Sequence, residues 1–180
     1  MELKTPQSHA RTEDEVLYQA SNLIGEYLKM KLSQKTGRWS SMSIEDNKNI
    51  VRRFFEEGPS KGDLSAADEL LAPNFALHVP LPSAPGIKGM NDVITACRAA
   101  FEHLNVTVED MVAEDDKVAA RFTARGIHKG AFMGLPPTGK PIIMTGIEIF
   151  RIENGKIAEL WGEANLLGLM QQLGILPSLG

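Results

Sequence analysis

Residues 141–165 read PIIMTGIEIFRIENGKIAELWGEAN and hold the strongest structural signal in the chain. Two runs with strand-like composition, Pro141–Glu153 and Lys156–Asn165, flank the dipeptide Asn154-Gly155. Asn-Gly between such runs is typical of a type I′ turn, because both residues tolerate the positive φ angles that this turn requires. The stretch therefore predicts a long antiparallel β-hairpin.

The sequence around this hairpin predicts more strands before it and a short helix after it. The expected elements are two further strands, one connection rich in glycine and proline, and one helix: Val106–Ala113, Lys117–His128, Lys129–Lys140 and Leu166–Leu173. Asp115-Asp116 joins the two strands, and Gly174 ends the helix. The second half of the chain is therefore expected to form an antiparallel meander.

The preceding part of the chain has mainly helical periodicity. We expect a helix that Ser43 and Asp46 cap and that Gly58-Pro59 stops, then a helix, a strand and a third helix: Leu64–Leu71, Phe75–Val79 and about Gly89 to Leu104. Clustered helices followed by hairpin-linked strands favour an α+β fold over a parallel βαβ fold. A curved antiparallel sheet wrapped over about three helices would form a cone whose open end accepts a ligand.

The first 42 residues differ from the rest of the chain. Residues 1–10 are polar, and from Thr12 apolar residues recur at helical spacing, which indicates an amphipathic helix. The stretch Lys35–Ser43 has the composition of a linker. We therefore expect residues 1–42 to form a polar tail and a helical arm, and residues 43–180 to form one domain.

Composition excludes several classes of function. A net charge of −4 gives no reason to expect nucleic acid or anionic lipid as a partner. The single cysteine, Cys97, cannot form an internal disulfide, and no cysteine and histidine residues have metal-site spacing. No apolar run is long enough to span a bilayer and the N-terminus has no signal-peptide centre, so we expect a cytoplasmic protein.

The domain resembles the SnoaL-like polyketide cyclases, members of the NTF2-like superfamily that include ester cyclases. The stretches that carry the resemblance are Gly126–Gly130, Gly134–Lys140, Thr145–Arg151, Asn154–Ile157 with Trp161, and Gln172–Gly174. The resemblance covers roughly residues 47–174 and leaves the N-terminal arm outside. It implies an NTF2-like cone, a homodimer, no cofactor, and a small hydrophobic organic ligand. The best-known members close a ring by intramolecular aldol condensation of a polyketide methyl ester.

Strand alternation selects the candidate site residues. If the apolar row of each strand faces the cone, four polar residues in those rows face it too: His128, Glu148, Glu163 and Asn165. We take these as the catalytic candidates. The expected substrate-binding residues are apolar members of the same rows, one loop methionine, and a histidine that the family often has: Phe122, Met144, Phe150, Trp161, Met133 and His78.

The chain departs from the family pattern at Asn165. The resemblance places a catalytic aspartate four residues after Trp161, and an amide at that position cannot accept a proton at neutral pH. Glu163 or Glu148 could supply the missing base, because burial in an apolar pocket raises the pKa of a carboxyl toward neutrality. We interpret the chain as a cyclase-like enzyme that acts on a carbonyl compound by acid–base chemistry. The alternatives are a non-catalytic binding protein, or a related isomerase, dehydratase or epoxide hydrolase.

Overall fold

The computed structural model describes residues 21–28, 43–80 and 83–177, and the chain divides into two units, Met1–Ser41 and Met42–Gly180. In the first unit, residues 21–28 form a helix. The helix start expected at Thr12 and most of the expected linker lie outside the described residues. No helix in the described part is long and apolar enough to cross a membrane.

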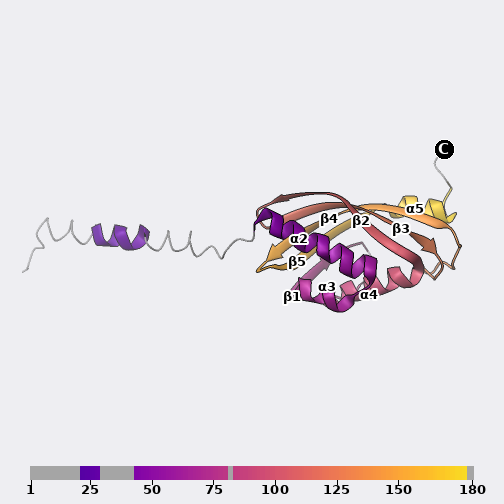
Figure 1. The fold of residues 1–180 in the computed structure, drawn as a ribbon, viewed down its shortest axis with the longest axis horizontal. Helices are drawn as coiled ribbons and strands as arrows, with labels where there is room; N and C mark the ends of the chain where they lie inside the picture. The colour runs from indigo at the N-terminus through magenta and orange to yellow at the C-terminus, as the bar shows by residue number, and fades with distance from the viewer. Residues whose placement is uncertain (1–20, 29–42, 81–82, 178–180) are drawn as a thin grey trace, which may run out of the picture. The chain divides into compact units, whose positions relative to one another are not determined.

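The second unit has an α+β fold, as expected, built on a curved five-stranded sheet (Figure 1). The strands are β1 (Leu71–His78), β2 (Phe101–Glu114), β3 (Lys117–His128), β4 (Pro141–Glu153) and β5 (Lys156–Ala164). Their order in the sheet is β1-β5-β4-β3-β2, with every pair antiparallel except β1–β5, which is parallel. Asn154 and Gly155 have φ angles of 52° and 76°, which confirms the predicted left-handed turn between β4 and β5.

Helices cover the concave side of this sheet (Figure 1). They are α2 (Ile44–Phe55), the π-helix η1 (Glu56–Lys61), α3 (Leu64–Leu70) and α4 (Gly86–Ala100), and α5 (Leu166–Leu173) follows the last strand. The predicted cap of α2 is confirmed, because the Ser43 hydroxyl accepts from the Asp46 N–H while Asp46 Oδ2 accepts from the Ser43 N–H.

Two predicted helix ends were wrong. Gly58-Pro59 does not stop the first helix, because the chain continues through both residues as η1 and turns only at Gly62, with a φ of 78°. The wider π-helical turn accommodates the proline, which has no N–H to donate. The third helix ends at Ala100 instead of Leu104, because Phe101 already pairs with His128 in the sheet.

The core joins the helices to the sheet through packed aromatic rings. Phe54 and Phe55 of α2 contact Phe150 of β4, with ring centroids 5.8 and 5.6 Å apart, and Phe55 also contacts Phe122 of β3 at 5.6 Å. Phe54, Phe55 and Phe150 are almost completely buried. Such edge-to-face contacts add to the hydrophobic gain from burial, so this cluster fixes α2 on the sheet.

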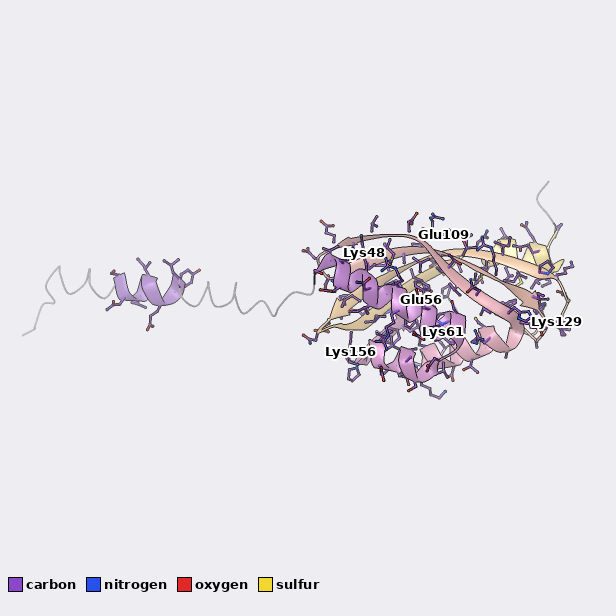
Figure 2. The ribbon with its side chains drawn as sticks, viewed as in Figure 1. Lys48, Glu56, Lys61, Glu109, Lys129 and Lys156 are labelled. Carbon is purple, nitrogen blue, oxygen red and sulfur yellow. The ribbon has the colours of Figure 1, made fainter. Side chains whose placement is uncertain are left out.

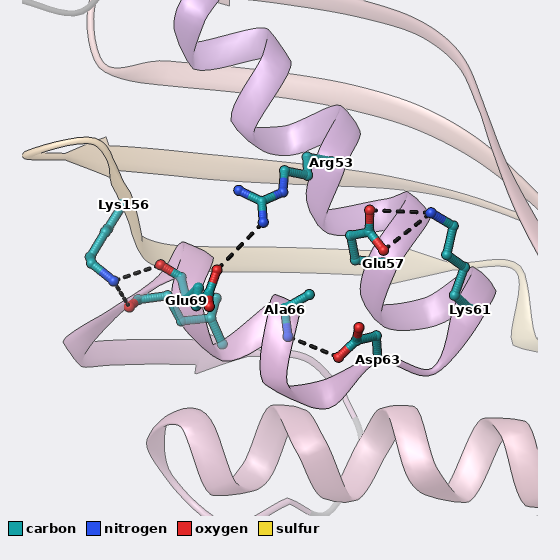
Figure 3. A network of polar contacts seen from close by, with 8 residues as sticks. Arg53, Glu57, Lys61, Asp63, Ala66, Glu69 and Lys156 are labelled. Atoms are coloured by element: carbon teal, nitrogen blue, oxygen red, sulfur yellow. Dashed lines mark hydrogen bonds and ion pairs between the residues drawn. The ribbon is translucent and has the colours of Figure 1, made fainter.

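Polar contacts tie α3 to its neighbours on the outside of the core (Figure 3). Lys156, just after the β4–β5 turn, donates from Nζ to the carbonyl oxygens of Glu69 and Leu71, at the C-terminal end of α3. The Glu69 carboxylate also forms an ion pair with Arg53 of α2 at 3.5 Å. A cation at the negative end of a helix is favourable, and these contacts link the hairpin to the helical layer.

Candidate functional site

An apolar pocket lies between α2, η1 and α4 on one side and the concave face of the sheet on the other. It has roughly 960 Å³ of empty space when the part open to solvent is included. Its wall is formed mainly by aliphatic, aromatic and sulfur-containing side chains, including Phe55, Met90, Cys97, Phe101, Phe122 and Met144. By contrast, charged residues such as Lys61, Glu109 and Lys129 are exposed on the outside of the domain (Figure 2).

Glu148 is a half-buried acid that lines this pocket. It lies on β4 between Ala120 of β3 and Gly162 of β5, which are its partners in the sheet. Its Oε2 atom is buried and has no hydrogen-bond partner within the described structure. Burial raises the pKa of this carboxyl to about 8, because the low-polarity wall disfavours the charged form. The group therefore exchanges a proton near neutral pH, as an acid–base catalyst must.

Gly162 makes room for that carboxyl. A Cβ atom at this position would lie 3.1 Å from Val79 Cγ1 and 3.3 Å from Glu148 Cγ. Both contacts are closer than side-chain carbons ordinarily approach, so even alanine would crowd the glutamate. Sequence analysis missed Gly162, although a glycine inside a strand often marks a place where another group comes close.

Cys97 of α4 lines the same pocket. Its pKa is raised to about 11, first by burial and then by the negative charge of Glu148. The thiol and the carboxyl line the same pocket. Sequence analysis did not place Cys97 on the pocket wall, since helical periodicity marks an inward face without showing whether that face meets a cavity.

The pocket wall has few hydrogen-bond donors. Within the described residues, no serine, threonine, tyrosine, tryptophan, asparagine, glutamine, histidine, lysine or arginine lines it. Its ionisable side chains are Glu148, Cys97 and Glu163. Any proton transfer inside the pocket therefore centres on a carboxyl group.

Strand alternation predicted the inward faces of β3 and β4 correctly. Phe122 and Met144 line the pocket next to Glu148, and Phe150 points inward but is fully buried under α2. Met133, expected to touch a ligand, is 54% exposed and lies in the β3–β4 connection away from the pocket-lining residues. Its φ of 48°, followed by Gly134 at 80°, identifies a tight turn between Phe132 and Leu135.

The predicted inward face of β5 was wrong for Trp161 because the strand contains a bulge. Arg151 pairs with Glu159 whereas Ile152 pairs with Ile157, so Ala158 is an extra residue on β5. Ile157 and Leu160 are therefore both completely buried, and Trp161 turns to the outer face. There its ring stacks on His78 at 5.1 Å, and His78 Nε2 lies 3.3 Å from Glu159 Oε2. His78 and Trp161 are thus partners on the outer face and do not line the pocket.

The same bulge changes the position of Glu163. This residue borders the pocket, but it pairs with the exposed Ile147, shares the outward face with Trp161, and is itself exposed. Of the two candidate carboxyls, only Glu148 is on the inward face of its strand. The structure therefore favours Glu148 over Glu163 as the acid–base group.

Asn165 caps a helix at the pocket rim. Strand β5 ends at Ala164, and the Asn165 side-chain oxygen accepts a hydrogen bond from the Gly168 N–H at 2.8 Å, at the start of α5. Ala164 and Leu166 line the pocket whereas Asn165 does not. The expectation that Asn165 faces the cone as a strand residue was therefore wrong, because β5 ends at Ala164 and the Asn165 side chain caps α5.

His128 is a buried structural residue that lies behind the pocket wall. Its side chain is completely buried, the Thr138 N–H donates to its Nδ1 at 3.3 Å, and Thr138 Oγ1 lies 3.1 Å from the same nitrogen. Its backbone N–H donates to the Lys140 carbonyl oxygen and its carbonyl oxygen accepts from the Gly139 N–H. These two bonds hold the start and the end of the β3–β4 connection together. Its ring packs 5.6 Å from Phe101, which does line the pocket, but His128 itself was wrongly expected at the pocket edge.

Comparison with known proteins identifies the family. The model of the SnoaL-like polyketide cyclases matches residues 49–173. This chain belongs to the SnoaL-like polyketide cyclase family. No curated protein sequence matches it significantly.

Solved structures of similar proteins share the fold of this SnoaL-like protein. TsrD from Streptomyces laurentii is 34% identical over 75% of this chain and 99% of its own, with a TM-score of 0.68. IdmH from Streptomyces antibioticus, described as a candidate polyketide cyclase, is 34% identical over 71% of this chain and 98% of its own, with a TM-score of 0.64. AclR from Streptomyces galilaeus, described as a candidate hydroxylase, is 28% identical over 77% and 87%, with a TM-score of 0.69. These similarities support a cyclase-type role for the SnoaL-like domain.

Proposed function

We propose that this SnoaL-like protein is a cofactor-free enzyme that closes or rearranges a small hydrophobic carbonyl compound, with Glu148 as its acid–base group. The observation that carries the proposal is the unpartnered Glu148 carboxyl in an otherwise apolar pocket. A raised pKa makes its conjugate base stronger than that of an ordinary glutamate, and about a tenth of the molecules carry it ionised at pH 7.

One carboxyl is sufficient for an aldol closure, because the proton it takes is later returned. The Glu148 carboxylate removes a proton from a carbon next to a carbonyl group, and the electron pair forms an enolate. The enolate carbon then bonds to a second carbonyl carbon of the same molecule, whose oxygen becomes an alkoxide. That alkoxide takes the proton back from Glu148, so the reaction is redox-neutral and the enzyme is regenerated.

The wall of the pocket limits the substrate class. Among the described residues, no neutral side-chain donor lines the pocket to stabilise an enolate oxygen, apart from the thiol of Cys97, which is a weak donor. The stabilisation must therefore come largely from the substrate itself. A carbon between two carbonyl groups meets this requirement, because its conjugate base spreads the charge over two oxygens.

Exchange of a carbon-bound proton tests this proposal without the natural substrate. The probe is an aryl β-ketoester such as ethyl benzoylacetate, whose C–H exchange with deuterated water is followed by NMR. Glu148→Gln should lower the protein-catalysed exchange at least about 100-fold, the usual scale of general acid–base assistance. Glu163→Gln is the matched control and should change the rate little. Equal loss in both variants, or loss only in Glu163→Gln, would contradict the assignment to Glu148.

A non-catalytic binding protein is the second candidate. The observation in its favour is Asn165, which stands where the resemblance expects an acid and serves instead as a helix cap. On this alternative, Glu148→Gln would weaken the binding of the β-ketoester while wild-type protein catalyses no exchange above the solvent rate. The same two variants therefore separate the two functions.

A further inference from the structure

The sign of the charge on the pocket wall restricts what the pocket can hold. Within the described residues, no lysine, arginine or histidine lines it, whereas two carboxyls do: Glu148 on the inward face and Glu163 at the border. The wall can therefore be neutral or negative, but never positive. An anionic ligand would lose its hydration and gain no counter-charge, so the pocket selects against carboxylates and phosphates.

The Oε2 atom of Glu148 lacks the hydrogen-bond donor that a buried carboxylate normally has. Buried carboxylates in proteins are paired or hydrogen-bonded, yet Glu148 Oε2 has no partner in the described structure. Because no side chain of the neighbouring wall, among the described residues, carries an N–H or hydroxyl donor, a molecule inside the pocket is the natural source of one. An N–H donor that carries positive charge would form the strongest such bond.

The aromatic and methionine side chains of the wall suit the hydrophobic part of such a ligand. The rings of Phe55, Phe101 and Phe122 line the pocket, and aromatic faces attract cations in desolvated sites. The thioethers of Met90 and Met144 add a polarisable surface that adapts to different shapes. We propose that the pocket binds hydrophobic amines, held as ammonium ions against the Glu148 carboxylate. The proposal uses the same pocket as the proposed reaction but does not depend on turnover.

Proton balance gives this binding mode a characteristic pH dependence. Below pH 8 most of the free protein carries Glu148 as the neutral acid, so binding of an ammonium ion releases one proton to solvent. The affinity should then rise about tenfold for each pH unit between pH 6 and 7 and level off above pH 8. A neutral ligand that accepts a hydrogen bond from the acid would show the opposite trend, with weaker binding above pH 8.

Three naphthalene compounds that differ in one group test the proposal: 2-naphthylmethylamine, 2-naphthylmethanol and 2-naphthoate. Their affinities for the full chain are measured by calorimetry at pH 6, 7 and 8, in two buffers with different ionisation enthalpies to count released protons. We expect the amine to bind at least about tenfold more tightly than the alcohol at pH 8, with proton release at pH 6, and the naphthoate to bind weakest.

Variants show whether Glu148 is responsible. Glu148→Gln, which is nearly isosteric, should remove the advantage of the amine and its pH dependence but keep alcohol binding, and Glu148→Met provides a second neutral replacement. Glu109→Gln, at an exposed residue that does not line the pocket, should retain the amine preference. Equal wild-type affinities for the amine and the alcohol, or an amine preference that survives Glu148→Gln, would overturn the proposal. If the alcohol binds, the exchange depends on Glu148 and the amine has no advantage, the proposed reaction stands and the amine site is overturned. If the amine is preferred but the protein catalyses no exchange, the amine site stands and the proposed reaction is overturned.

Discussion

Glu148 of β4 lies directly opposite Gly162 of β5, and the missing side chain of the glycine provides the space that the glutamate occupies. A methyl group at residue 162 would lie 3.3 Å from Glu148 Cγ. The position of the buried acid therefore depends on a residue with no chemistry of its own.

Gly162→Ala should accordingly lower the rate of catalysis in the pocket more than it lowers the stability of the fold. The added methyl group pushes against Glu148 and Val79, so we expect exchange of the β-ketoester to fall by about tenfold or more, since small displacements of a catalytic group are costly. The free energy of unfolding should fall by about 1 to 2 kcal/mol, the usual cost of overpacking. Urea unfolding and NMR exchange rates measure the two effects. Unchanged exchange in a folded variant would show that the Glu148 position is not critical.

Glu148 should make stability fall as pH rises. Its pKa is about 8 in the folded protein, against 4.5 for an ordinary glutamate, so the folded state binds the proton more tightly than the unfolded state. This contribution is fully present below pH 4.5 and is lost progressively until about pH 8. We compare the free energy of unfolding of Glu148→Gln with that of the wild type at two pH values. The difference should favour the variant by about 2 to 4 kcal/mol more at pH 8 than at pH 4.5.

Urea unfolding of both proteins across this pH range measures the effect, and Glu163→Gln serves as the control because its carboxyl is exposed. A Glu148→Gln curve parallel to that of the wild type would show that the carboxyl is not buried in solution.

Cys97 should report on both the pocket and its acid. It is the single cysteine of the chain, and its pKa of about 11 makes alkylation by iodoacetamide slow at pH 8. Glu148→Gln removes the smaller, electrostatic cause of that raised pKa, so labelling measured by mass spectrometry should become faster by a factor of about two or more. A ligand in the pocket should slow it. Labelling insensitive to Glu148→Gln would show that the charge of Glu148 does not raise the pKa of Cys97.

Asn165 should behave as a helix cap. Its side chain accepts from the Gly168 N–H, so Asn165→Ala should cost about 1 kcal/mol of stability, whereas Asn165→Asp should keep it because aspartate caps equally well. Thermal or urea unfolding measures both. Asn165→Asp also restores the acid that the family resemblance expects, so a gain in β-ketoester exchange would show that this rim position reaches the ligand.

The outer face of the sheet should carry a homodimer interface. Ile143, Ile147 and Ile149 are 41 to 54% exposed there, next to the partly exposed Trp161, which is an unusual concentration of apolar surface. Ile149→Asp should shift the protein toward monomer in light scattering at micromolar concentration. Ile44→Asp is the matched control, because that isoleucine is also 41% exposed but lies on α2. A wild-type monomer would rule the dimer out.

Local sequence was enough for the elements whose signals are local. The Asn154-Gly155 turn, the Ser43–Asp46 cap and the alternation of β3 and β4 each depend on residues within a few positions of one another, so the sequence alone predicted the hairpin, a helix start and the inward direction of Glu148. The α+β class followed from the order of these elements. Membership of the SnoaL-like family agrees with the predicted hairpin and with the predicted α+β class.

Only the tertiary structure decided which residues meet in the pocket. The extra residue at Ala158 carries no local signal, yet it turns Trp161 to the outer face and puts Glu163 on the outward side of β5. The pairing of Gly162 with Glu148 and the approach of Cys97 from α4 bring together positions that are distant in sequence. Strand alternation has a period of two, so one unpaired residue reverses every later direction, and the pocket is defined by packing that the sequence does not display.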